Sequence, residues 1–315
     1  MKENQKIHLS VLVPLYNEEK SLISLFEKVD RAITPLDLNW EIIFIDDGST
    51  DGSFGVLKNL KTSSPRIRIV RLRRNFGKSA ALSAGFSRAR GERIITLDAD
   101  LQDDPGEIGA ILNKMDEGFD LVSGWRVDRR DRLAKKSTSR IFNRVTSLLT
   151  GIKIHDFNCG LKGFRRELAR DISLYGELHR YIPVLAYWKG FNVAEIKVRH
   201  HRRAFGKSKF GIYRFFAGFM DMLTVMFLTR YSKKPLHLFG AAGSLLFLVG
   251  FVINTYLVLE TLLGPDFLRV RPLMLLGVLM MLVGFQLISI GLLGEMMTMS
   301  LHSKKEEYII REIFD

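Results

Sequence analysis

Residues 93–104 read RIITLDADLQDD, a short run rich in β-branched residues that ends directly in aspartates. Comparable short runs stand before and after it, separated by stretches with helical spacing: HLSVLV from His8, EIIFI at Glu41–Ile45, IRIVRL at Ile67–Leu72 and DLVS from Asp120. Such alternation is typical of a parallel sheet flanked by helices. The first 200 residues therefore predict an α/β domain.

Polar residues gather directly after three of these runs. They are PLYNE at Pro14–Glu18, DDGSTD at Asp46–Asp51 and DADLQD at Asp98–Asp103. Ligands of parallel α/β sheets bind beyond the carboxyl ends of the strands, so we expect a binding site at this edge. Two familiar nucleotide fingerprints are missing: no G-x-G-x-x-G occurs, and the leading glycine of a P-loop before Gly77-Lys78-Ser79 would fall on Leu72.

Asp98 and Asp100 are candidate metal ligands. At the end of a strand, alternate residues point the same way, so the two carboxylates could share one hard cation such as Mg²⁺ or Mn²⁺. The alternative is a solvated turn that caps a helix beginning near Pro105. Asp104 is the better cap, so both interpretations can hold at once.

Two apolar runs follow the α/β region, Leu236–Leu259 and Leu273–Gly294, with 24 and 22 residues and no Asp, Glu, Lys or Arg. At about 1.5 Å per helical residue, each is long enough to cross the roughly 30 Å hydrocarbon core of a bilayer. The alternative is a pair of buried core helices. A charged residue at mid-bilayer would cost about 3 kcal/mol, and its absence from both runs favours transmembrane helices.

The composition suits a protein at an anionic membrane surface. Lys and Arg number 47 against 34 Asp and Glu, a formal charge of +13 that attracts acidic lipids, phosphates or nucleic acid. The N-terminal MKENQKIHLSVLVP has no apolar stretch long enough for a secretory signal. One cysteine, Cys159, excludes an intramolecular disulfide and suits a reducing compartment. We expect a multi-pass inner-membrane protein with its large domain and both termini in the cytoplasm.

Four ordered motifs resemble a known family. VPLYNE from Val13, DDGSTD from Asp46, R-N-x-G at Arg74–Gly77 and DADLQD from Asp98 look like family 2 glycosyltransferases, whose GT-A fold is a Rossmann-like parallel sheet. The two terminal apolar runs narrow the resemblance to polyprenyl-phosphate glycosyltransferases, of the dolichyl-phosphate mannose synthase and undecaprenyl-phosphate glucosyltransferase type. The resemblance implies inverting transfer of a sugar to membrane polyprenyl phosphate from a nucleotide donor, UDP-glucose-like or GDP-mannose-like. We also expect a homo-oligomer.

The resemblance also implies roles for the strand-end residues. Asp46 and Asp47 would contact the base and ribose, and Asp98 would orient the nucleoside. Asp100 and Gln102 would hold Mg²⁺ or Mn²⁺, which neutralises the charge that builds up as a nucleoside diphosphate departs. The implied donor-binding set is Pro14, Tyr16, Asn17, Glu18, Asp46, Asp47, Gly77, Lys78, Asp98, Ala99 and Asp100.

Asp156 begins the segment DFNCGLK, which is similar to the family segment whose carboxylate faces the acceptor. The resemblance implies Asp156, Asp100 and Arg203 as catalytic residues. A phosphate monoester has its second pKa near about 6, so the acceptor is mostly ionised at neutral pH and needs little deprotonation. Asp156 is therefore either a general base or a group that positions a cation such as Lys162 or an arginine.

A basic loop at Arg199–Lys209, RHHRRAFGKSK, resembles the R-x-x-G-x-S-K loop that lies beside the acceptor and donor phosphates. The implied phosphate-binding residues are Arg126, Lys162, Arg203, Ser208 and Lys209. Arginine offers a two-pronged donor for phosphate, although the loop could also be a solvated cationic turn near the membrane. His200 and His201 have no Cys or Asp at metal-ligand spacing, so we assign them no metal role.

These features divide the chain into four predicted parts. Residues 1–209 form the catalytic domain, 210–235 amphipathic juxtamembrane helices, 236–298 two transmembrane helices and 299–315 a cytoplasmic tail. The segment Phe210–Thr229, with five phenylalanines, could instead be core.

Two other functions stay open. A processive polysaccharide synthase of the same fold would need a Q-x-x-R-W motif, and no tryptophan follows an arginine. A non-catalytic, membrane-tethered basic protein could use the +13 charge, for example to bind nucleic acid. Aspartates at successive strand ends would repel that polyanion, so nucleic acid is not an expected partner.

Overall fold

The computed structural model describes residues 6–127, 151–201, 235–263, 272–300 and 310–314, together with Asn143 and Ser147. The chain divides into two compact units. The first comprises Met1–Asp221 and Glu306–Asp315, and the second comprises Met222–Lys305. The predicted juxtamembrane helices at 210–235 lie outside the described residues except for Pro235.

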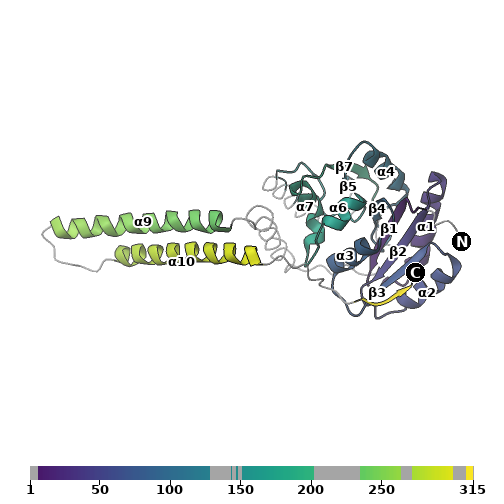
Figure 1. Cartoon of the computed structure of the whole chain (residues 1–315), viewed down its shortest axis with the longest axis horizontal. Helices are drawn as coiled ribbons and strands as arrows, with labels where there is room; N and C mark the ends of the chain where they lie inside the picture. Colours follow the sequence, from purple (N-terminus) through teal and green to yellow (C-terminus); the bar gives the residue numbers. More distant parts are fainter. Residues whose placement is uncertain are drawn as a thin grey trace. The chain divides into compact units, whose positions relative to one another are not determined.

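A mixed sheet forms the centre of the first unit (Figure 1). Its strands are β1 (Leu9–Leu15), β2 (Trp40–Asp46), β3 (Ile67–Leu72), β4 (Arg93–Thr96), β5 (Leu121–Arg126), β6 (Lys162–Arg165), β7 (Val193–Val198) and β8 (Ile310–Phe314). Among the described residues, their order across the sheet is β7-β5-β6-β4-β1-β2-β3-β8. Strands β3, β2, β1 and β4 are parallel neighbours, as are β5 and β7, whereas β6 and β8 pair antiparallel.

The sequence predicts β1 to β5 but not β6, β7 or β8, and two antiparallel strands, β6 and β8, join the expected parallel ones. Strand β6 shows why. It is only KGFR, four residues with a charged residue at each end, and it pairs with both β4 and β5. Its neighbours, rather than an apolar run of its own, make it a strand.

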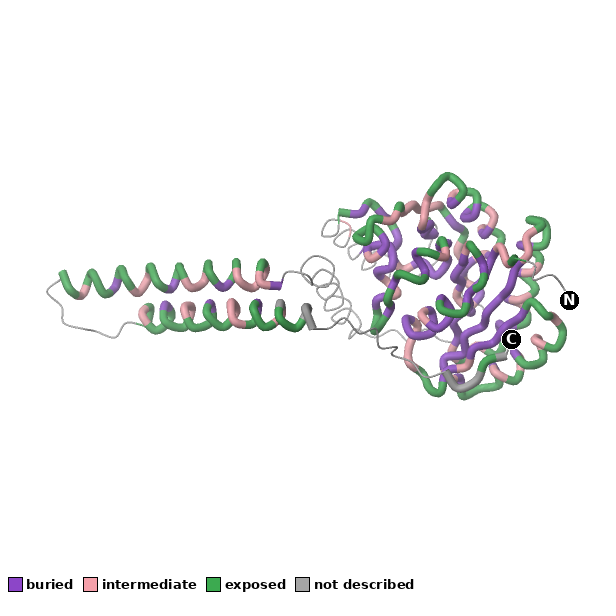
Figure 2. Tube along the Cα trace, in the orientation of Figure 1, coloured by how far each residue is buried: buried purple, intermediate pink, exposed green. Residues whose placement is uncertain are grey.

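Helices cover both faces of this sheet. They are α1 (Leu22–Ile33), α2 (Ser53–Ser63), α3 (Lys78–Arg88), α4 (Ile108–Asp116), α6 (Arg166–Asp171) and α7 (Ile182–Trp188), with 3₁₀ turns η1 (Thr34–Leu36), η2 (Pro105–Glu107) and η3 (Leu178–Tyr181). Helices α1, α2 and α4 share one apolar core with Val11, Val13 and Phe44. On the opposite face, α3 lies so close that a Cβ on Gly85 would stand 3.0 Å from Ile45 and 3.1 Å from Leu12. Strands β1 and β2, which are buried along their whole length, lie at the centre of the unit (Figure 2).

The second unit contains helices α9 (Pro235–Leu263) and α10 (Pro272–Ser300). The most apolar 18-residue stretches within Pro235–Leu263 and Pro272–Gly294 have mean hydropathies of 2.1 and 2.4, and only 11% of each stretch is buried. Large apolar residues are exposed along both helices, which are largely green in Figure 2. A core helix of a soluble protein would be mostly covered, so the exposure favours the transmembrane alternative over the core one. Both helices are long and apolar enough to span a membrane.

Glycines allow α9 and α10 to pack closely. A Cβ on Gly243 would lie 2.5 Å from the carbonyl oxygen of Gly284, and one on Gly250 would lie 2.4 Å from that of Gly277. Such contacts are typical of membrane helices, where small residues let two backbones approach. The two helices therefore form a hairpin whose spacing depends on these glycines.

Strand β8 follows α10 and belongs to the first unit. It pairs antiparallel with β3, with Leu72 opposite Ile310 and Ile69 opposite Phe314. Part of the segment predicted as a tail is therefore an edge strand of the sheet. The chain leaves the first unit before α9 and returns to it after α10.

Candidate active site

A cavity of about 300 Å³ opens at the carboxyl ends of β1, β2 and β4. Nine of the eleven residues predicted for donor binding line it, together with Leu15, Asn75 and Ala81: they are Pro14, Tyr16, Glu18, Asp47, Gly77, Lys78, Asp98, Ala99 and Asp100. Asn17 and Asp46 are not part of the lining. The structure therefore gathers most of the predicted residues where the strand-end rule places them.

The two aspartates at the end of β2, Asp46 and Asp47, have different surroundings. Asp47 accepts hydrogen bonds from the backbone N–H groups of Phe76 (2.8 Å) and Gly77 (2.9 Å) and remains at the cavity wall. Burial raises the pKa of Asp47, although these two N–H groups oppose the shift. Asp46 is fully buried, accepts from the backbone of Ser49 (2.8 Å) and lies 3.5 Å from Nε of Arg71. Asp46 therefore supports the loop from below the cavity.

Asn17 also acts within the loops. It adopts a left-handed backbone with φ 58°, and its side-chain oxygen accepts from the N–H of Thr50 (2.8 Å). Gly48 makes a second close contact, because at φ +71° a Cβ there would lie 2.5 Å from the backbone of Arg74. These contacts hold the loops after β1, β2 and β3 together.

Lys78 and Asp98 form an ion pair at the cavity, and each side chain is about one third exposed. Desolvation raises the pKa of the Asp98 carboxyl, but the positive charges of Lys78, Lys162 and Arg126 outweigh it, so this pKa lies below its usual value. Asp98 is therefore ionised at neutral pH. The cavity thus contains a cation beside its carboxylates, which suits a ligand with phosphate groups.

The Asp100 turn carries the predicted metal ligands. Leu101 has φ 61°, and the backbone N–H of Gln102 donates to the Asp100 carboxylate (3.2 Å). Among the described residues, no three His, Cys, Asp or Glu side chains come close enough to hold a metal by themselves. Mg²⁺ commonly takes one or two carboxylates and completes its shell with substrate phosphates. Asp100 at the cavity wall, with Gln102 beside it, fits that kind of shared site.

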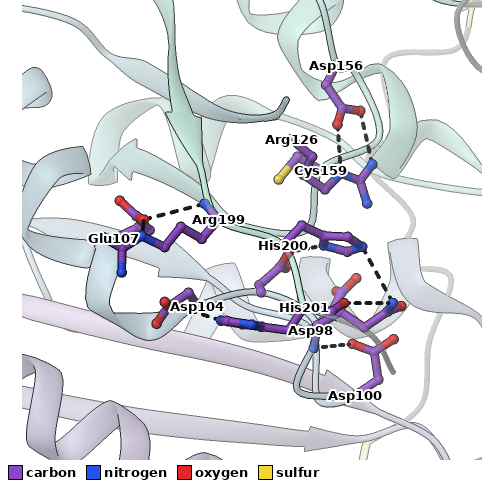
Figure 3. Close-up of polar contacts among 12 residues, drawn as sticks. Asp98, Asp100, Asp104, Glu107, Arg126, Asp156, Cys159, Arg199, His200 and His201 are labelled. Atoms are coloured by element: carbon purple, nitrogen blue, oxygen red, sulfur yellow. Dashed lines mark hydrogen bonds and ion pairs between the residues drawn. The ribbon is translucent and has the colours of Figure 1, made fainter. Parts of the chain in front are cut away.

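Two histidines to which the sequence assigns no metal role, His200 and His201, lie against the Asp100 turn (Figure 3). Residues Asp103 and His200 form an isolated antiparallel bridge, and Nε2 of His200 lies 3.5 Å from Nε2 of Gln102. Within the described part of the chain, Oδ2 of Asp103 and Nδ1 of His200 are buried without a hydrogen-bond partner. No spacing in the sequence could reveal this contact, because Gln102 and His200 are 98 residues apart.

Arg126 and Asp156 form a buried pair beside the cavity residues (Figure 3). The guanidinium donates from Nε to Oδ2 (2.7 Å) and from Nη2 to Oδ1 (3.0 Å), and the backbone N–H of Asn158 also donates to Oδ1 (3.1 Å). Burial would lower the pKa of Arg126, but the Asp156 charge raises it above its usual value. The segment passes Asp98 so closely that a Cβ on Gly160 would lie 2.5 Å from the Asp98 carboxyl carbon.

Lys162 is 3% exposed, and its ammonium donates to the backbone carbonyl of Cys159. Burial lowers the pKa of Lys162 and raises the pKa of the Cys159 thiol to about 12. Both groups therefore sit beneath the site rather than at its surface. The remaining predicted phosphate ligands, Arg203, Ser208 and Lys209, lie outside the described residues.

Comparisons with known proteins agree with this architecture. Residues 10–173 match the model of the family "Glycosyl transferase family 2". The chain is 38% identical to dodecaprenyl-phosphate galacturonate synthase of Rhizobium johnstonii, over 99% of this chain and 94% of that one. The chain belongs to glycosyl transferase family 2. The family resemblance predicted from the four motifs is therefore confirmed.

A second relative and a solved structure extend this likeness. The chain is 39% identical to undecaprenyl-phosphate 4-deoxy-4-formamido-L-arabinose transferase of Salmonella choleraesuis, covering 91% of this chain and 87% of that one. Glucosyl-3-phosphoglycerate synthase of Mycobacterium tuberculosis, solved with Mn²⁺, uridine diphosphate and phosphoglyceric acid, superposes with a TM-score of 0.54. That match covers 70% of this chain and 78% of that one at 18% identity, so it shows the fold alone. The predicted GT-A fold is confirmed.

Proposed function

We propose that the protein is a membrane-bound inverting glycosyltransferase that moves a sugar from a nucleotide-diphosphate sugar to polyprenyl phosphate. The observation that carries the proposal is the cavity, where Lys78 and the carboxylates of Asp47, Asp98 and Asp100 meet at the strand ends of a family 2 fold. The names of two relatives that match nearly the whole chain, a dodecaprenyl-phosphate and an undecaprenyl-phosphate transferase, support the lipid acceptor. Helices α9 and α10 would bring the enzyme to that lipid.

The donor side would use the cavity. Asp47 would face the nucleoside, and Lys78 and Asp100 would lie toward the diphosphate. A divalent cation on Asp100 and Gln102, Mg²⁺ or Mn²⁺, would supply positive charge where the leaving diphosphate becomes negative. The mycobacterial structure was solved with Mn²⁺ and uridine diphosphate, which supports a divalent cation in the donor site. That protein shares only its fold with this chain.

The transferred sugar is inferred from the relatives. The names of the relatives favour galacturonate or 4-deoxy-4-formamido-L-arabinose. The hexoses glucose and mannose, expected from the resemblance, remain candidates alongside them. We infer a sugar nucleotide whose nucleoside is either uridine or guanosine.

On the acceptor side, we propose that Asp156 positions Arg126. Both oxygens of Asp156 already accept hydrogen bonds, from the guanidinium and from the N–H of Asn158. The acceptor phosphate is mostly ionised at neutral pH and needs little help to lose a proton. Its oxygen would attack the anomeric carbon as the bond from that carbon to the donor diphosphate breaks. Arg126, held by Asp156, would neutralise the acceptor phosphate.

We further propose that the catalytic unit and both chain ends lie on one side of the membrane. The pairing of β8 with β3 supports this arrangement, because two spans between the parts of one folded unit must return the chain to its starting side. The cytoplasmic side remains the expectation from the sequence, as does assembly into a homo-oligomer.

An assay with purified full-length protein tests the proposed function. Uridine-diphosphate derivatives of galacturonate, 4-deoxy-4-formamido-L-arabinose and glucose, and GDP-mannose, are each incubated with undecaprenyl phosphate and Mg²⁺ or Mn²⁺. We expect one donor to yield a lipid-linked sugar sensitive to mild acid. Failure of all four donors under both metals, with protein that remains folded, would overturn the proposal.

A further inference from the structure

His179 is a mostly covered histidine that the site described above does not use. It lies in η3, and its side chain is 15% exposed. Its neighbour across the fold is Ser79, in the first turn of α3, which is 1% exposed and 100 residues earlier in the chain. The contact thus joins the segment that follows Asp156 to the helix that begins at the donor cavity.

Two hydrogen bonds join these residues. The backbone N–H of His179 donates to Oγ of Ser79 (3.1 Å), and Nδ1 of the imidazole lies 3.0 Å from the same oxygen. The Ser79 hydroxyl has one hydrogen to donate and two lone pairs that accept, so Oγ can accept from the backbone N–H and also bond to Nδ1. A neutral imidazole with its hydrogen on Nε2 would accept the hydroxyl hydrogen at Nδ1. The two bonds join η3 to the first turn of α3.

The electrostatic surroundings favour that neutral form. Burial lowers the pKa of His179 well below its usual value, and the nearby charges of Lys78 and Arg180 lower it further. A protonated imidazole would add a cation beside Lys78. With its pKa lowered, His179 adds no such charge at neutral pH.

The contact between His179 and Ser79 lies at the start of the helix that carries Lys78. Helix α3 begins after Gly77, which has φ +93°, and no side chain caps its first turn. Lys78 precedes Ser79 and pairs with Asp98 at the cavity. The first turn of α3 is therefore held by Asp98 through Lys78 and by His179 through Ser79.

We propose that His179 is a positioning residue of the donor site, which through Ser79 holds the first turn of α3 so that Lys78 faces the diphosphate of the nucleotide sugar. The inference rests on the proposed function, since it assigns Lys78 to the donor. Holding a cation in place before the donor arrives lowers the ordering cost of binding. His179 would also link the segment that carries Asp156 to the donor side of the site.

Steady-state kinetics of the full-length enzyme test this role. The variants are His179→Ala, Ser79→Ala and Ser79→Thr, with Ser87→Ala at the exposed far end of α3 as the matched control. A displacement of about 1 Å in a positioned group can cost up to about 100-fold. We expect His179→Ala and Ser79→Ala to raise the donor KM by about ten-fold to 100-fold with little change in the acceptor KM. Ser79→Thr, which keeps the hydroxyl, and Ser87→Ala should resemble the wild type.

A double-mutant cycle with Lys78→Ala separates positioning from general support. If His179 acts through Lys78, His179→Ala should cause little further loss in the Lys78→Ala background. Full additivity, or a donor KM unchanged in folded His179→Ala, would overturn the inference while leaving the proposed function intact. Titration with UDP and GDP in the presence of Mn²⁺ gives a second readout for variants too slow to assay. Wild-type protein that binds neither nucleotide would instead contradict the proposed function.

Discussion

Arg126 donates two hydrogen bonds to Asp156, at 2.7 and 3.0 Å, in a pair whose side chains are 14% and 3% exposed. Asp156, which the family resemblance implies as a base, therefore already binds an arginine. Two parallel bonds between a guanidinium and a carboxylate fix the plane of the arginine as well as its charge. The pair is built to orient Arg126.

The first prediction follows from this pair. Asp156→Asn should raise the acceptor KM by about ten-fold and lower kcat by less than about 100-fold, because the lost charge loosens Arg126 without removing a proton acceptor. Kinetics with varied undecaprenyl phosphate measure both constants. In the wild type, activity should rise through about pH 6 with the second ionisation of the acceptor. A near-normal acceptor KM with kcat a thousand-fold lower would identify a general base instead.

The second prediction concerns Asp100. Asp100→Asn should abolish divalent-dependent transfer, since it removes a charged ligand where the diphosphate becomes negative. Product formation across Mg²⁺ and Mn²⁺ titrations measures this effect, and paramagnetic resonance of bound Mn²⁺ with UDP gives a readout independent of turnover. Asp104→Asn is the matched control, because Asp104 caps η2 through the N–H of Gly106 (3.0 Å) and asparagine caps equally well. Equal metal response in both variants would reject the metal assignment.

The third prediction tests topology by cysteine labelling. Burial, which raises the pKa of the Cys159 thiol to about 12, should keep Cys159 unreactive at pH 8. A cysteine at Asp266, between α9 and α10, should react with a membrane-impermeant maleimide in intact cells. A cysteine at the exposed Ser63 of α2 should react only after the membrane is opened. The reverse pattern would place the catalytic unit outside the cytoplasm.

The fourth prediction concerns the helical hairpin. Gly243→Leu should destabilise it by about 1–3 kcal/mol, the usual range for overpacking, because even a Cβ would lie 2.5 Å from the backbone of Gly284. Thermal unfolding in detergent measures the loss. Gly240→Leu provides the comparison, since the nearest atoms there belong to the flexible side chain of Leu236, at 3.2 Å. Similar stability of the two variants would show that the glycine contact is not required.

Much of the donor cavity could be predicted from the sequence. Strands β1 to β5 are marked by apolar β-branched runs, and the residues after a strand reach a parallel sheet's binding edge whatever the rest of the chain does. Nine of eleven predicted donor residues therefore line the cavity. Asp46 does not line the cavity, because the last residue of a strand can still point into the core. Its side chain is fully buried there.

The α/β class, the strand-end loops and the two apolar helices can be predicted from the sequence, because each depends on periodicity or composition within a short stretch. The antiparallel strands β6 and β8 become visible only in the folded chain, as do the contacts of Arg126 with Asp156, Gln102 with His200 and Ser79 with His179. These partners are 30, 98 and 100 residues apart. Such pairs meet because the sheet brings distant segments together, and no local pattern in the chain encodes that meeting.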